Sequence, residues 1–380
     1  MDLVVASLEA WDTVWRRNQH LVSRLLRDDP TLRVLFVEPA ADPLHDVVSR
    51  RRPGRGVPVS EISGFEGRLM RFRPVKRLPR RFDKHADNHL AHAIIRAADA
   101  ARMPHPLLWV NDPGAAALAR ISNWTTLYDI TDDWAAADRA PASLARVRTE
   151  EEWLLRHAEA VVACSTELVR RKAPSRLGTI DLVPNAVDVV AYRSPAPRPA
   201  DLPTASAVYV GTLHTDRLDV ELCESTAREL IGRGTLVLVG PNALSRSDTE
   251  RLLAAGVILL GPRAHEDVVG YLQHADVLLV PHIVTAFTES LDPIKLYEYS
   301  AVGRPVVATP VAGFRDGNDP RVRVTTPVEF PRAVAAIVRT TTRFPLGADA
   351  PVPTWDDRAA EMRDVIGRLP SSDDHWETVI

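Results

Sequence analysis

The hydrophobic positions of this chain form short apolar runs, which alternate with longer stretches where apolar residues recur every three or four positions. Such runs between turn residues are typical of strands buried on both faces, and the longer spacing is typical of amphipathic helices. This alternation predicts parallel strands with crossover helices, the α/β fold class. We predict a first helix at 14–26 and strands at 2–7, 32–39, 106–111, 125–130, 160–165, 206–211, 235–240, 257–261, 276–282 and 304–309.

The strands fall into two series, separated by a proline-rich segment that has no apolar run. We predict two Rossmann-like, doubly wound domains that face each other across a cleft. Ligands of such folds bind beyond the carboxyl ends of the strands, which here places the ligand in that cleft. The last helix either belongs to the second domain or crosses back to the first. The predicted segments are a first domain at 1–192, a linker at 193–205, a second domain at 206–354 and a C-terminal helix in 355–380.

Composition narrows the functional classes. The chain has 380 residues and a net charge of −3, which gives no electrostatic case for a nucleic acid as partner. No run approaches roughly 18 apolar residues, and the N-terminus lacks the basic start of a signal peptide, so we expect a cytoplasmic protein. The dinucleotide motif GxGxxG, the phosphate loop GxxxxGK[ST] and metal-ligand spacings such as HExxH are missing. We therefore expect no cofactor and no metal.

The stretch "TESLDPIKLYEYSAVGRPVVATP", residues 288–310, predicts a helix that starts near Pro293, with Asp292 as N-cap. Lys295 then lies in the first turn, where the helix dipole disfavours a cation. A diphosphate would explain this placement, because the ammonium and the N–H groups at Ile294 and beyond could bind it together. One turn later, Glu298 could accept hydrogen bonds from two ribose hydroxyls. The alternative is an ordinary Lys–Glu pair on a helix surface.

Two other turns suit the same ligand. Gly211 and Thr212 end a strand, where a small residue lets a ligand approach the backbone, and Arg217 follows within reach of phosphate oxygens. Pro262 and Arg263 follow the strand at 257–261, and their main chain could hold a nucleotide base. Each turn could equally be a plain connection between a strand and a helix.

Together these residues resemble a known signature. "SLDPIKLYEYSAVGRPVVATP" is similar to the donor site of retaining glycosyltransferases of the GT-B fold, in the large sequence-based family 4. The nearest branch reads "DPxKLYEYLAxGxPVV" and is typical of bacterial cell-envelope, polysaccharide and natural-product glycosyltransferases. The resemblance extends in order over nearly the whole chain, through "WDTVWRRNQHLVSRLL", "LFVEP", "YDITDDW", "LVPNAVD" and "YVGTLHTDRLDVELC".

The resemblance implies transfer of a sugar from a nucleotide-diphosphate donor to a hydroxyl acceptor, with retention and without a metal. Glu298 would hold the ribose, while Lys295 and Arg217 would bind the diphosphate. The first Glu of the family pattern falls on Ser290, and Glu289 is one residue out of register. Either residue, with Asp292 nearby, would contact the donor sugar. No catalytic carboxylate is evident.

Two other classes remain open. One is a nucleotide-sugar epimerase or a pseudo-glycosyltransferase on the same fold, and the epimerase would turn over without an acceptor. The other is a non-catalytic protein that binds a nucleotide or carbohydrate, which the serine at position 290 keeps open. Neither the base, the sugar nor the acceptor can be derived from the residues.

The acceptor is expected at the first domain, on residues that match the branch's "RPQHL" segment or follow its strands. Each of them could instead be a cap or a turn residue. These candidates are Asp12, Trp15, Arg17, His20, Asn111, Asp112, Asp132 and Asp133.

Residues 68–84, "RLMRFRPVKRLPRRFDK", hold eight Lys or Arg residues and one Asp. Basic side chains between apolar ones could dock on the anionic inner face of a membrane, where lipid-linked acceptors reside. The alternatives are a solvated basic face and a site for a soluble anionic acceptor.

Overall fold

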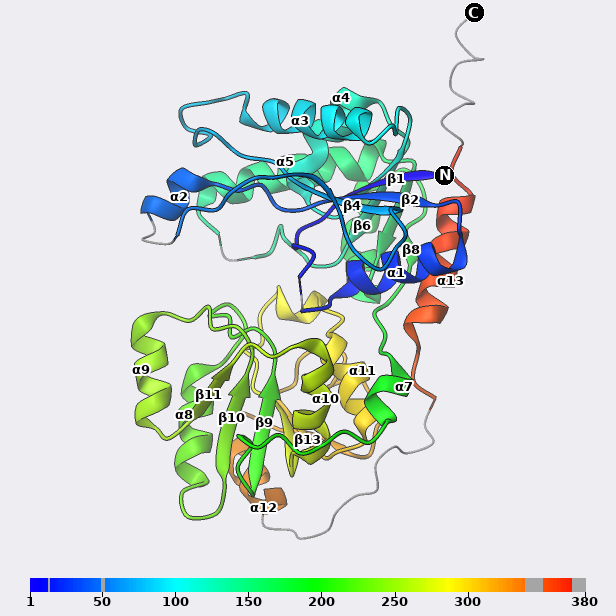
Figure 1. Ribbon diagram of the computed structural model, residues 1–380. Helices are drawn as coiled ribbons and strands as arrows, with labels where there is room; N and C mark the ends of the chain where they lie inside the picture. The colour runs from blue at the N-terminus through cyan, green and yellow to red at the C-terminus, as the bar shows by residue number, and fades with distance from the viewer. Residues whose placement is uncertain (13, 49–51, 138, 339–350, 371–380) are drawn as a thin grey trace, which may run out of the picture. The chain divides into compact units, whose positions relative to one another are not determined.

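Each half of the chain builds its own sheet in the computed structural model, which describes all residues except 13, 49–51, 138, 339–350 and 371–380 (Figure 1). The first unit comprises Met1–Ala135, Arg139–Pro184 and Asp356–Ile380, and the second comprises Ala136–Asp138 and Asn185–Trp355, within those described limits. Both units have a largely parallel sheet with helices on its two faces. The predicted doubly wound α/β class is confirmed.

The sheet of the first unit has the strand order β3-β4-β2-β1-β5-β6-β7-β8. All neighbours are parallel except β3 and β4, which pair antiparallel at one edge. The strands are β1 Asp2–Ala6, β2 Arg33–Val37, β3 Val57–Glu61, β4 Leu69–Arg73, β5 Leu107–Val110, β6 Thr126–Ile130, β7 Ala160–Ala163 and β8 Asp181–Leu182.

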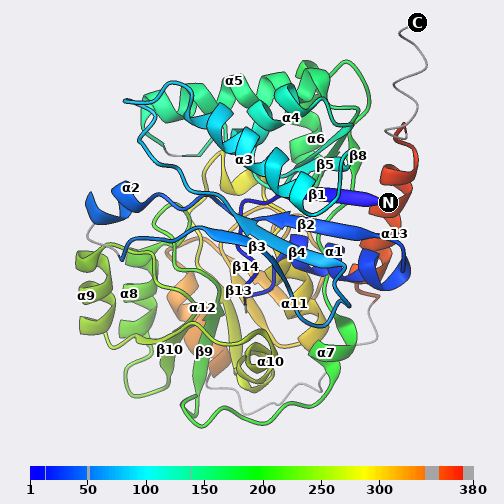
Figure 2. The same cartoon turned by 45° about the horizontal axis from the view of Figure 1, so that its top comes forward.

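Helices cover both faces of this sheet. Figures 1 and 2 show α3, α4 and α5 on one face and α1 and α13 on the other. The helices of this unit are α1 Arg17–Asp28, α2 Pro43–Val48, α3 Ala86–Ala100, α4 Ala116–Ser122, α5 Pro141–His157, α6 Thr166–Lys172 and α13 Trp355–Gly367. Asp356 of α13 forms ion pairs with Arg24 and Arg27 of α1.

The sheet of the second unit has the order β11-β10-β9-β12-β13-β14 and is parallel throughout its described pairs. Its strands are β9 Ser206–Val210, β10 Thr235–Val239, β11 Ile258–Gly261, β12 Val277–Val280, β13 Val306–Ala308 and β14 Val322–Val324. Its helices are α7 Val189–Arg193, α8 Val220–Glu229, α9 Arg246–Ala254, α10 His265–His274, α11 Ile294–Val302 and α12 Phe330–Val338.

Strand β9 shows why an uninterrupted apolar run becomes a central strand. Val208 and Val210 pack in one core with residues of α7, α10 and α11, while Ala207 and Tyr209 pack in a second core with residues of α8 and α12. Successive side chains of a strand point to opposite faces, so a strand covered on both sides needs apolar residues at every position.

The observed division of the chain lies earlier than the predicted boundary after residue 192. Helix α7 belongs to the second unit because the Tyr192 side chain is buried in that unit's core. The side chain of Gln273 donates to the carbonyls of Tyr192 and Ser194 and thereby attaches the following proline-rich segment to the same unit.

Strands β3 and β4 were not among the predicted elements. Leu69 of β4 is fully buried, and Met70 and Phe72 pack against the core of the first unit. The apolar residues of 68–73 therefore face inward, which corrects the expectation that they alternate with basic residues on a docking surface. In the sequence, the basic residues Arg68, Arg71 and Arg73 around its apolar residues conceal the apolar pattern of this strand.

Candidate functional site

Three neighbouring strands of the second unit end in a glycine with positive φ: Gly211 after β9 (φ 144°), Gly240 after β10 (φ 141°) and Gly261 in β11 (φ 72°). A Cβ on Gly240 would lie 2.3 Å from the carbonyl oxygen of Gly211, and a Cβ on Gly211 would lie 2.6 Å from Nζ of Lys295. At both positions the positive φ disfavours a side chain, and at Gly240 the close approach of the Gly211 backbone excludes one as well. The ammonium of Lys295 consequently lies against the backbone at the end of β9.

Lys295 is the second residue of α11, which starts at Ile294 rather than at Pro293. Pro293 is the N-cap residue and makes no side-chain capping bond. Asp292, predicted as the cap, instead accepts the N–H of Asn185 at 2.5 Å and the hydroxyl of Tyr297 at 2.8 Å. Its carboxylate therefore anchors the segment that leads into α7 and does not cap α11.

The ammonium of Lys295 forms no ion pair with a carboxylate in the part of the chain that the structure describes. It lies 5.1 Å from the ring centroid of Tyr209. The pKa of Lys295 is lowered from 10.5 to about 8: burial lowers it most, the charge of Glu298 partly offsets this, and the charge of Arg217 adds to the lowering. A partly buried cation without a counter-ion is costly in the absence of an anion.

Arg217 and His282 complete the same environment. The guanidinium of Arg217 lies 5.3 Å over the ring of Phe287, and its Nε is 3.3 Å from Asp216. His282 follows β12 and shares a 3.1 Å hydrogen bond with the Tyr209 hydroxyl. Burial first, and then the charges of Lys295 and Arg217, hold the pKa of His282 well below its usual range. The histidine is thus neutral beside two cations.

Glu298 lies one turn beyond Lys295 on α11. Its Oε1 accepts the hydroxyl of Tyr192 from α7 at 2.5 Å. This bond fixes the position of the carboxylate, and its second oxygen has no donor among the described residues. The predicted surface pair of Lys295 and Glu298 is absent from the described contacts, which leaves both groups available to a ligand.

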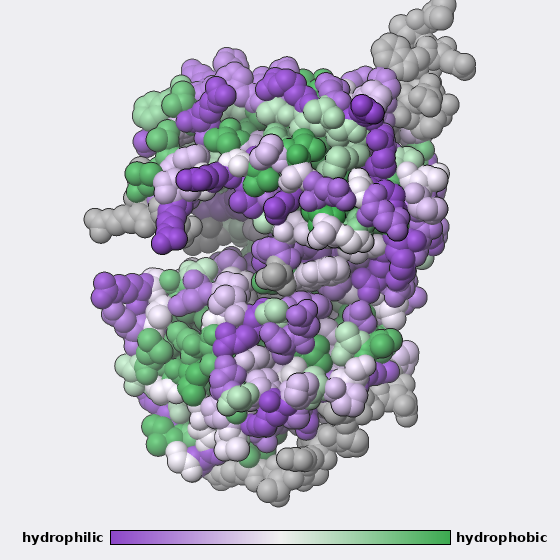
Figure 3. Space-filling model, in the orientation of Figure 1, coloured by the Kyte–Doolittle hydropathy of each residue, from purple (hydrophilic) through white to green (hydrophobic). Residues whose placement is uncertain are grey.

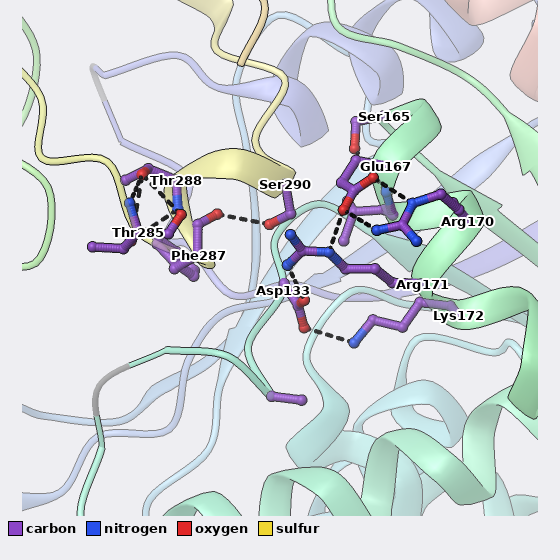
Figure 4. A network of polar contacts seen from close by, with 12 residues as sticks. Asp133, Ser165, Glu167, Arg170, Arg171, Lys172, Thr285, Phe287, Thr288 and Ser290 are labelled. Atoms are coloured by element: carbon purple, nitrogen blue, oxygen red, sulfur yellow. Dashed lines mark hydrogen bonds and ion pairs between the residues drawn. The ribbon is translucent and has the colours of Figure 1, made fainter. Parts of the chain in front are cut away.

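The residues predicted to contact the donor sugar differ in their availability. Ser290, at the end of the short 3₁₀ helix Thr288–Ser290, is fully buried and donates its hydroxyl to the Phe287 carbonyl at 2.7 Å (Figure 4). Glu289 forms an ion pair with Arg315 through Oε2 at 2.7 Å, while its Oε1 is buried and makes no hydrogen bond. Of the two, Glu289 has the free acceptor atom.

Arg263 is occupied by intramolecular bonds. Its guanidinium binds Asp201 at 2.7 Å, the Tyr271 hydroxyl at 2.8 Å and the carbonyls of Leu260 and Pro262. These contacts tie the segment that precedes β9 to the turn after β11. A base contact by this side chain therefore has little support, whereas the exposed turn at Pro262 stays a candidate.

Several acceptor candidates of the first unit are buried in structural networks. Arg17 forms an ion pair with Asp129 at 3.1 Å and donates to the Pro184 carbonyl. Asn111 is buried and donates to the Asp129 carbonyl at 2.9 Å. These three side chains hold together α1 and the ends of β5 and β6, and for Arg17 and Asn111 such contacts favour a structural role over an acceptor contact.

Asp133 belongs to a second network. Its carboxylate binds Lys172 at 2.7 Å and Arg171 at 3.0 Å (Figure 4). Lys172 also binds Glu151 at 2.7 Å. This buried cluster connects the turn after β6 to α5 and α6, so Asp133 has structural partners already.

Other acceptor candidates lie near the surface of the first unit. Asp12 is exposed and accepts the N–H of Val14 at 2.8 Å. Trp15 packs edge-on against the buried His20, with ring centroids 5.2 Å apart. Asp132 is half-buried in the turn after β6.

A cavity of about 320 Å³ opens at the carboxyl ends of β1, β2 and β5. Asp112, which caps the turn after β5 by accepting the Gly114 N–H at 2.8 Å, lines this cavity, and burial raises its pKa. The structure adds three arginines to the wall: Arg80, which belongs to the basic tract 68–84, and Arg139 and Arg146, which the sequence did not indicate. Asp112 is the acceptor candidate that this cavity supports.

The sequence analysis missed several members of the donor-side cluster. His282 follows a predicted strand directly, so the rule that ligands bind at the carboxyl ends of strands could have identified it. Gly240 repeats the strand-glycine pattern of Gly211. No signal in the sequence indicated that Tyr192 contacts Glu298. Across the described residues, no three His, Cys, Asp or Glu side chains group as metal ligands.

Comparison with known sequences relates the chain to sugar-transferring enzymes. Residues 204–341 match the family model described as Glycosyl transferases group 1. The chain is 24% identical over 251 residues to a Bacillus subtilis (strain 168) protein that carries the provisional name teichuronic acid biosynthesis glycosyltransferase TuaH. The match covers 60% of this chain and 63% of the relative, so it spans less than two thirds of the relative's length.

Solved structures with a similar fold cover nearly the whole chain at low identity. A sucrose-phosphate synthase from Thermosynechococcus elongatus aligns over 97% of this chain and 94% of its own, with a TM-score of 0.61 and 17% identity. The Anabaena protein HepE, in complex with UDP and glucose, aligns over 100% of this chain and 99% of its own, with a TM-score of 0.60 and 15% identity. An E. coli structure described as trehalose-6-phosphate bound with UDP-2-fluoro glucose aligns over 99% of this chain and 97% of its own, with a TM-score of 0.62 and 12% identity. These likenesses confirm the predicted GT-B fold.

Proposed function

We propose that the chain is a glycosyltransferase that moves a sugar from a nucleotide-diphosphate donor to a hydroxyl acceptor, with retention and without a metal. The second unit binds the donor, and the first unit supplies acceptor contacts, among them Asp112. The likeness to Glycosyl transferases group 1, which falls on residues 204–341, supports this assignment of the donor side. HepE and the E. coli structure are described with UDP or a UDP sugar, which makes UDP the first nucleotide to test.

One observation carries the proposal: the ammonium of Lys295, beside Arg217, has no carboxylate counter-ion among the described residues and lies at the N-terminus of α11. A helix N-terminus with unsatisfied N–H groups and two adjacent cations is suited to a group with two or more negative charges. Glu298 on the next turn then faces the ribose hydroxyls, and Glu289, whose buried Oε1 makes no hydrogen bond with the described residues, is the candidate for the sugar contact. Phosphate, ribose and sugar contacts thus follow one another along one short segment.

The same groups account for the chemistry. When the bond from the sugar to the diphosphate breaks, negative charge develops on the leaving phosphate. Lys295, Arg217 and the free N–H groups of α11 stabilise that charge, and because they are already in place they need little reorganisation. Retention follows when the acceptor hydroxyl attacks the face from which the diphosphate leaves. The residues described around the donor site include no carboxylate positioned as a covalent nucleophile, so we assign none.

Thermal unfolding in the presence of UDP, GDP, ADP, TDP and CMP tests the donor site. A ligand at 100 times its Kd adds about 2.7 kcal/mol of stability, which raises the melting temperature by several degrees. We expect one diphosphate to raise it in the wild type and to lose this effect in Lys295→Met and Arg217→Gln. Arg246→Gln, on a side chain that is 93% exposed and pairs with Glu250, is the matched control.

A donor that stabilises the protein must then be hydrolysed or transferred in the presence of an acceptor library, with the anomeric configuration of the product read by NMR. Conversion of the donor sugar into its epimer without any acceptor would instead indicate an epimerase. Binding without turnover would indicate a non-catalytic protein. A wild type that unfolds cooperatively and responds to no nucleotide would refute the donor site.

For location, we propose a cytoplasmic protein that touches the inner membrane face through part of residues 68–84. None of the helices in the described part of the chain has the length and apolar character that crossing a bilayer requires.

A further inference from the structure

A second, larger groove of about 730 Å³ lies in the first unit, between the antiparallel edge of the sheet and the outer side of α3. Its wall is mainly apolar and includes Val57, Phe72, Val75, Leu78 and Leu90. This volume falls in the range of roughly 300–1,000 Å³ that is usual for small-molecule sites. The acceptor candidates from the sequence do not line this groove, so it calls for a separate explanation.

The charges on the groove are almost all positive. Arg73, Lys76 and His89 have acidic partners, Glu38, Asp42 and Asp83. By contrast, Arg77 on the loop and Arg96 on α3 line the groove and pair with no carboxylate among the described residues. Two guanidiniums beside an apolar wall indicate a ligand with an anionic group and a hydrocarbon part.

The loop at residues 75–84, which forms one wall of the groove, also exposes apolar and basic side chains to solvent. Val75, Leu78 and Phe82 are 40%, 47% and 68% exposed, which is unusual for three large apolar side chains within eight residues. Arg81 and Lys84 are exposed beside them and have no carboxylate partner in the described chain, and the Arg81 guanidinium lies 4.7 Å over the Phe82 ring. Figure 3 shows apolar and hydrophilic side chains interspersed over this part of the first unit.

This loop is held in place rather than free. Arg80 binds Asp87 on α3 through two nitrogens at 2.6 and 2.9 Å, and the N–H groups of Phe82 and Asp83 donate to the Pro79 carbonyl. The exposed apolar side chains therefore stay on the surface in a fixed arrangement instead of collapsing onto the core. Because the loop is already ordered, little conformational entropy is lost when this surface binds a ligand.

We propose that residues 75–84 dock on an anionic lipid bilayer, and that the groove takes a hydrocarbon chain of one lipid while Arg77 and Arg96 bind its phosphate. This inference rests on the proposed membrane contact and does not depend on glycosyl transfer. Of the apolar residues of 68–84, Val75, Leu78 and Phe82 are those that the structure leaves exposed. Charge complementarity selects the occupant, because Asp83 is the one acid that lines the groove and it already binds His89.

A bilayer explains more of the surface than a soluble anion does. Inorganic phosphate would satisfy Arg77 and Arg96 but would leave Leu78, Phe82 and the apolar wall in water. A single hydrocarbon contact gives only marginal membrane binding, and stable attachment requires a second, electrostatic signal. The loop offers both signals within ten residues.

Co-sedimentation of the full chain with vesicles, without nucleotide, tests the inference. The vesicles are phosphatidylcholine with or without phosphatidylglycerol, at about 0.1 M and about 1 M salt, where charges are screened beyond roughly 10 Å and 3 Å. We expect binding to the anionic vesicles at low salt, with much weaker binding to neutral vesicles or at high salt. Each basic residue near an anionic surface contributes about fivefold to the partition coefficient, so Arg77→Gln/Arg81→Gln/Lys84→Gln should weaken binding about 100-fold.

The apolar arm is tested separately by Leu78→Ser/Phe82→Ser, for which we expect a loss of about tenfold or more. Matched controls remove the same charge, or two apolar side chains that are at least as exposed, elsewhere: Arg156→Gln/Arg170→Gln/Arg246→Gln for the charges, and Leu177→Ser/Ile231→Ser, at residues 92% and 73% exposed, for the apolar side chains. Retention of wild-type binding by both controls supports the proposal.

Three results would overturn it: no binding of the wild type to anionic vesicles, equal losses in the control variants, or unchanged binding of the serine variant with full competition by inorganic phosphate. The last result would assign the arginines to a soluble phosphate. Nucleotide-dependent stabilisation, measured on the same variants, is expected to stay at the wild-type level because the donor-side residues belong to the second unit. A failure of membrane docking is thus distinguishable from a failure of the donor site.

Discussion

Replacing Lys295 by methionine should make the protein more stable and remove its response to the donor nucleotide. Methionine keeps the length and the apolar stem of the side chain but removes the ammonium, which has no carboxylate partner among the described residues. A buried charge without a partner destabilises the folded state, so its removal is favourable unless the charge binds something. We therefore expect the variant to be more stable than the wild type without ligand, and to lose the stabilisation that the nucleotide gives the wild type.

The magnitude follows from the pKa. Burial lowers the pKa of Lys295 from 10.5 to about 8. At 1.36 kcal/mol per pKa unit, holding the charged form in the folded state costs roughly 3 kcal/mol at pH 7. The side chain is partly exposed, and solvent screening reduces this to about 1–2 kcal/mol. In a unit of this size, 1 kcal/mol corresponds to about 2–4 °C, so the methionine variant should melt about 2–8 °C higher.

The effect has a defined pH window. Because the folded-state pKa is below the unfolded value, the folded state loses its proton first as the pH rises. The destabilisation is therefore complete below pH 8 and disappears between about pH 8 and pH 10.5. Differential scanning calorimetry at pH 7 and at about pH 10 should show a stabilised variant at the lower pH and a much smaller difference at the higher one.

Lys172 provides the control, because it is a buried lysine that, unlike Lys295, binds two carboxylates, Asp133 and Glu151, at 2.7 Å each. Lys172→Met leaves two acids without this partner and should cost about 3–5 kcal/mol, the opposite sign. A Lys295→Met variant that is less stable than the wild type at pH 7, or that still responds to the diphosphate, would refute the reasoning about this site.

Three further substitutions probe the donor side. Gly211→Ala should lower the stability of the second unit by about 1–3 kcal/mol and abolish nucleotide binding, because φ is positive and the new Cβ would lie 2.6 Å from Nζ of Lys295; urea unfolding and calorimetric titration measure both. Glu298→Gln should weaken binding of the ribonucleoside diphosphate about 10-fold but leave the 2′,3′-dideoxy analogue nearly unaffected, since the carboxylate is proposed to bind the ribose hydroxyls. Titration of the two nucleotides in parallel decides this, and equal losses for both would contradict the ribose contact. Arg217→Gln should raise the Kd of the diphosphate by about 10- to 100-fold and that of the nucleoside hardly at all, which the same titration measures; an equal loss for the nucleoside would assign Arg217 to another part of the ligand.

Much of the fold could be predicted from the sequence, because it depends on local patterns. Apolar runs such as the one at 206–211 must be buried on both faces, which makes them central strands whatever their neighbours are. The unfavourable placement of Lys295 at a helix start is also local, and it pointed to an anion before any contact was known. That the first Glu of the family pattern falls on Ser290, with Glu289 one residue out of register, was visible in the same way.

The contacts that decide which candidates are available are not local. Arg17 and Asp129 are 112 residues apart in the chain, and Tyr192 and Glu298 are 106 apart. Nothing near either residue in the sequence indicates its partner, so Arg17 was expected at the acceptor when it is in fact buried in an ion pair. The position of β4 was hidden for a similar reason, since its basic residues look like a surface tract until the neighbouring strand is in place.

The sequence by itself determined the fold class, the paired series of strands and the cationic start of α11, since hydrophobic periodicity and helix polarity act over a few residues. The tertiary structure alone decided which charged groups remain without a partner: among the described residues Lys295 has no carboxylate partner, whereas Arg17, Asp133 and Arg263 form ion pairs. An ion pair forms only when packing brings both members out of water at the same place, and the packing of whole sheets and helices sets that geometry.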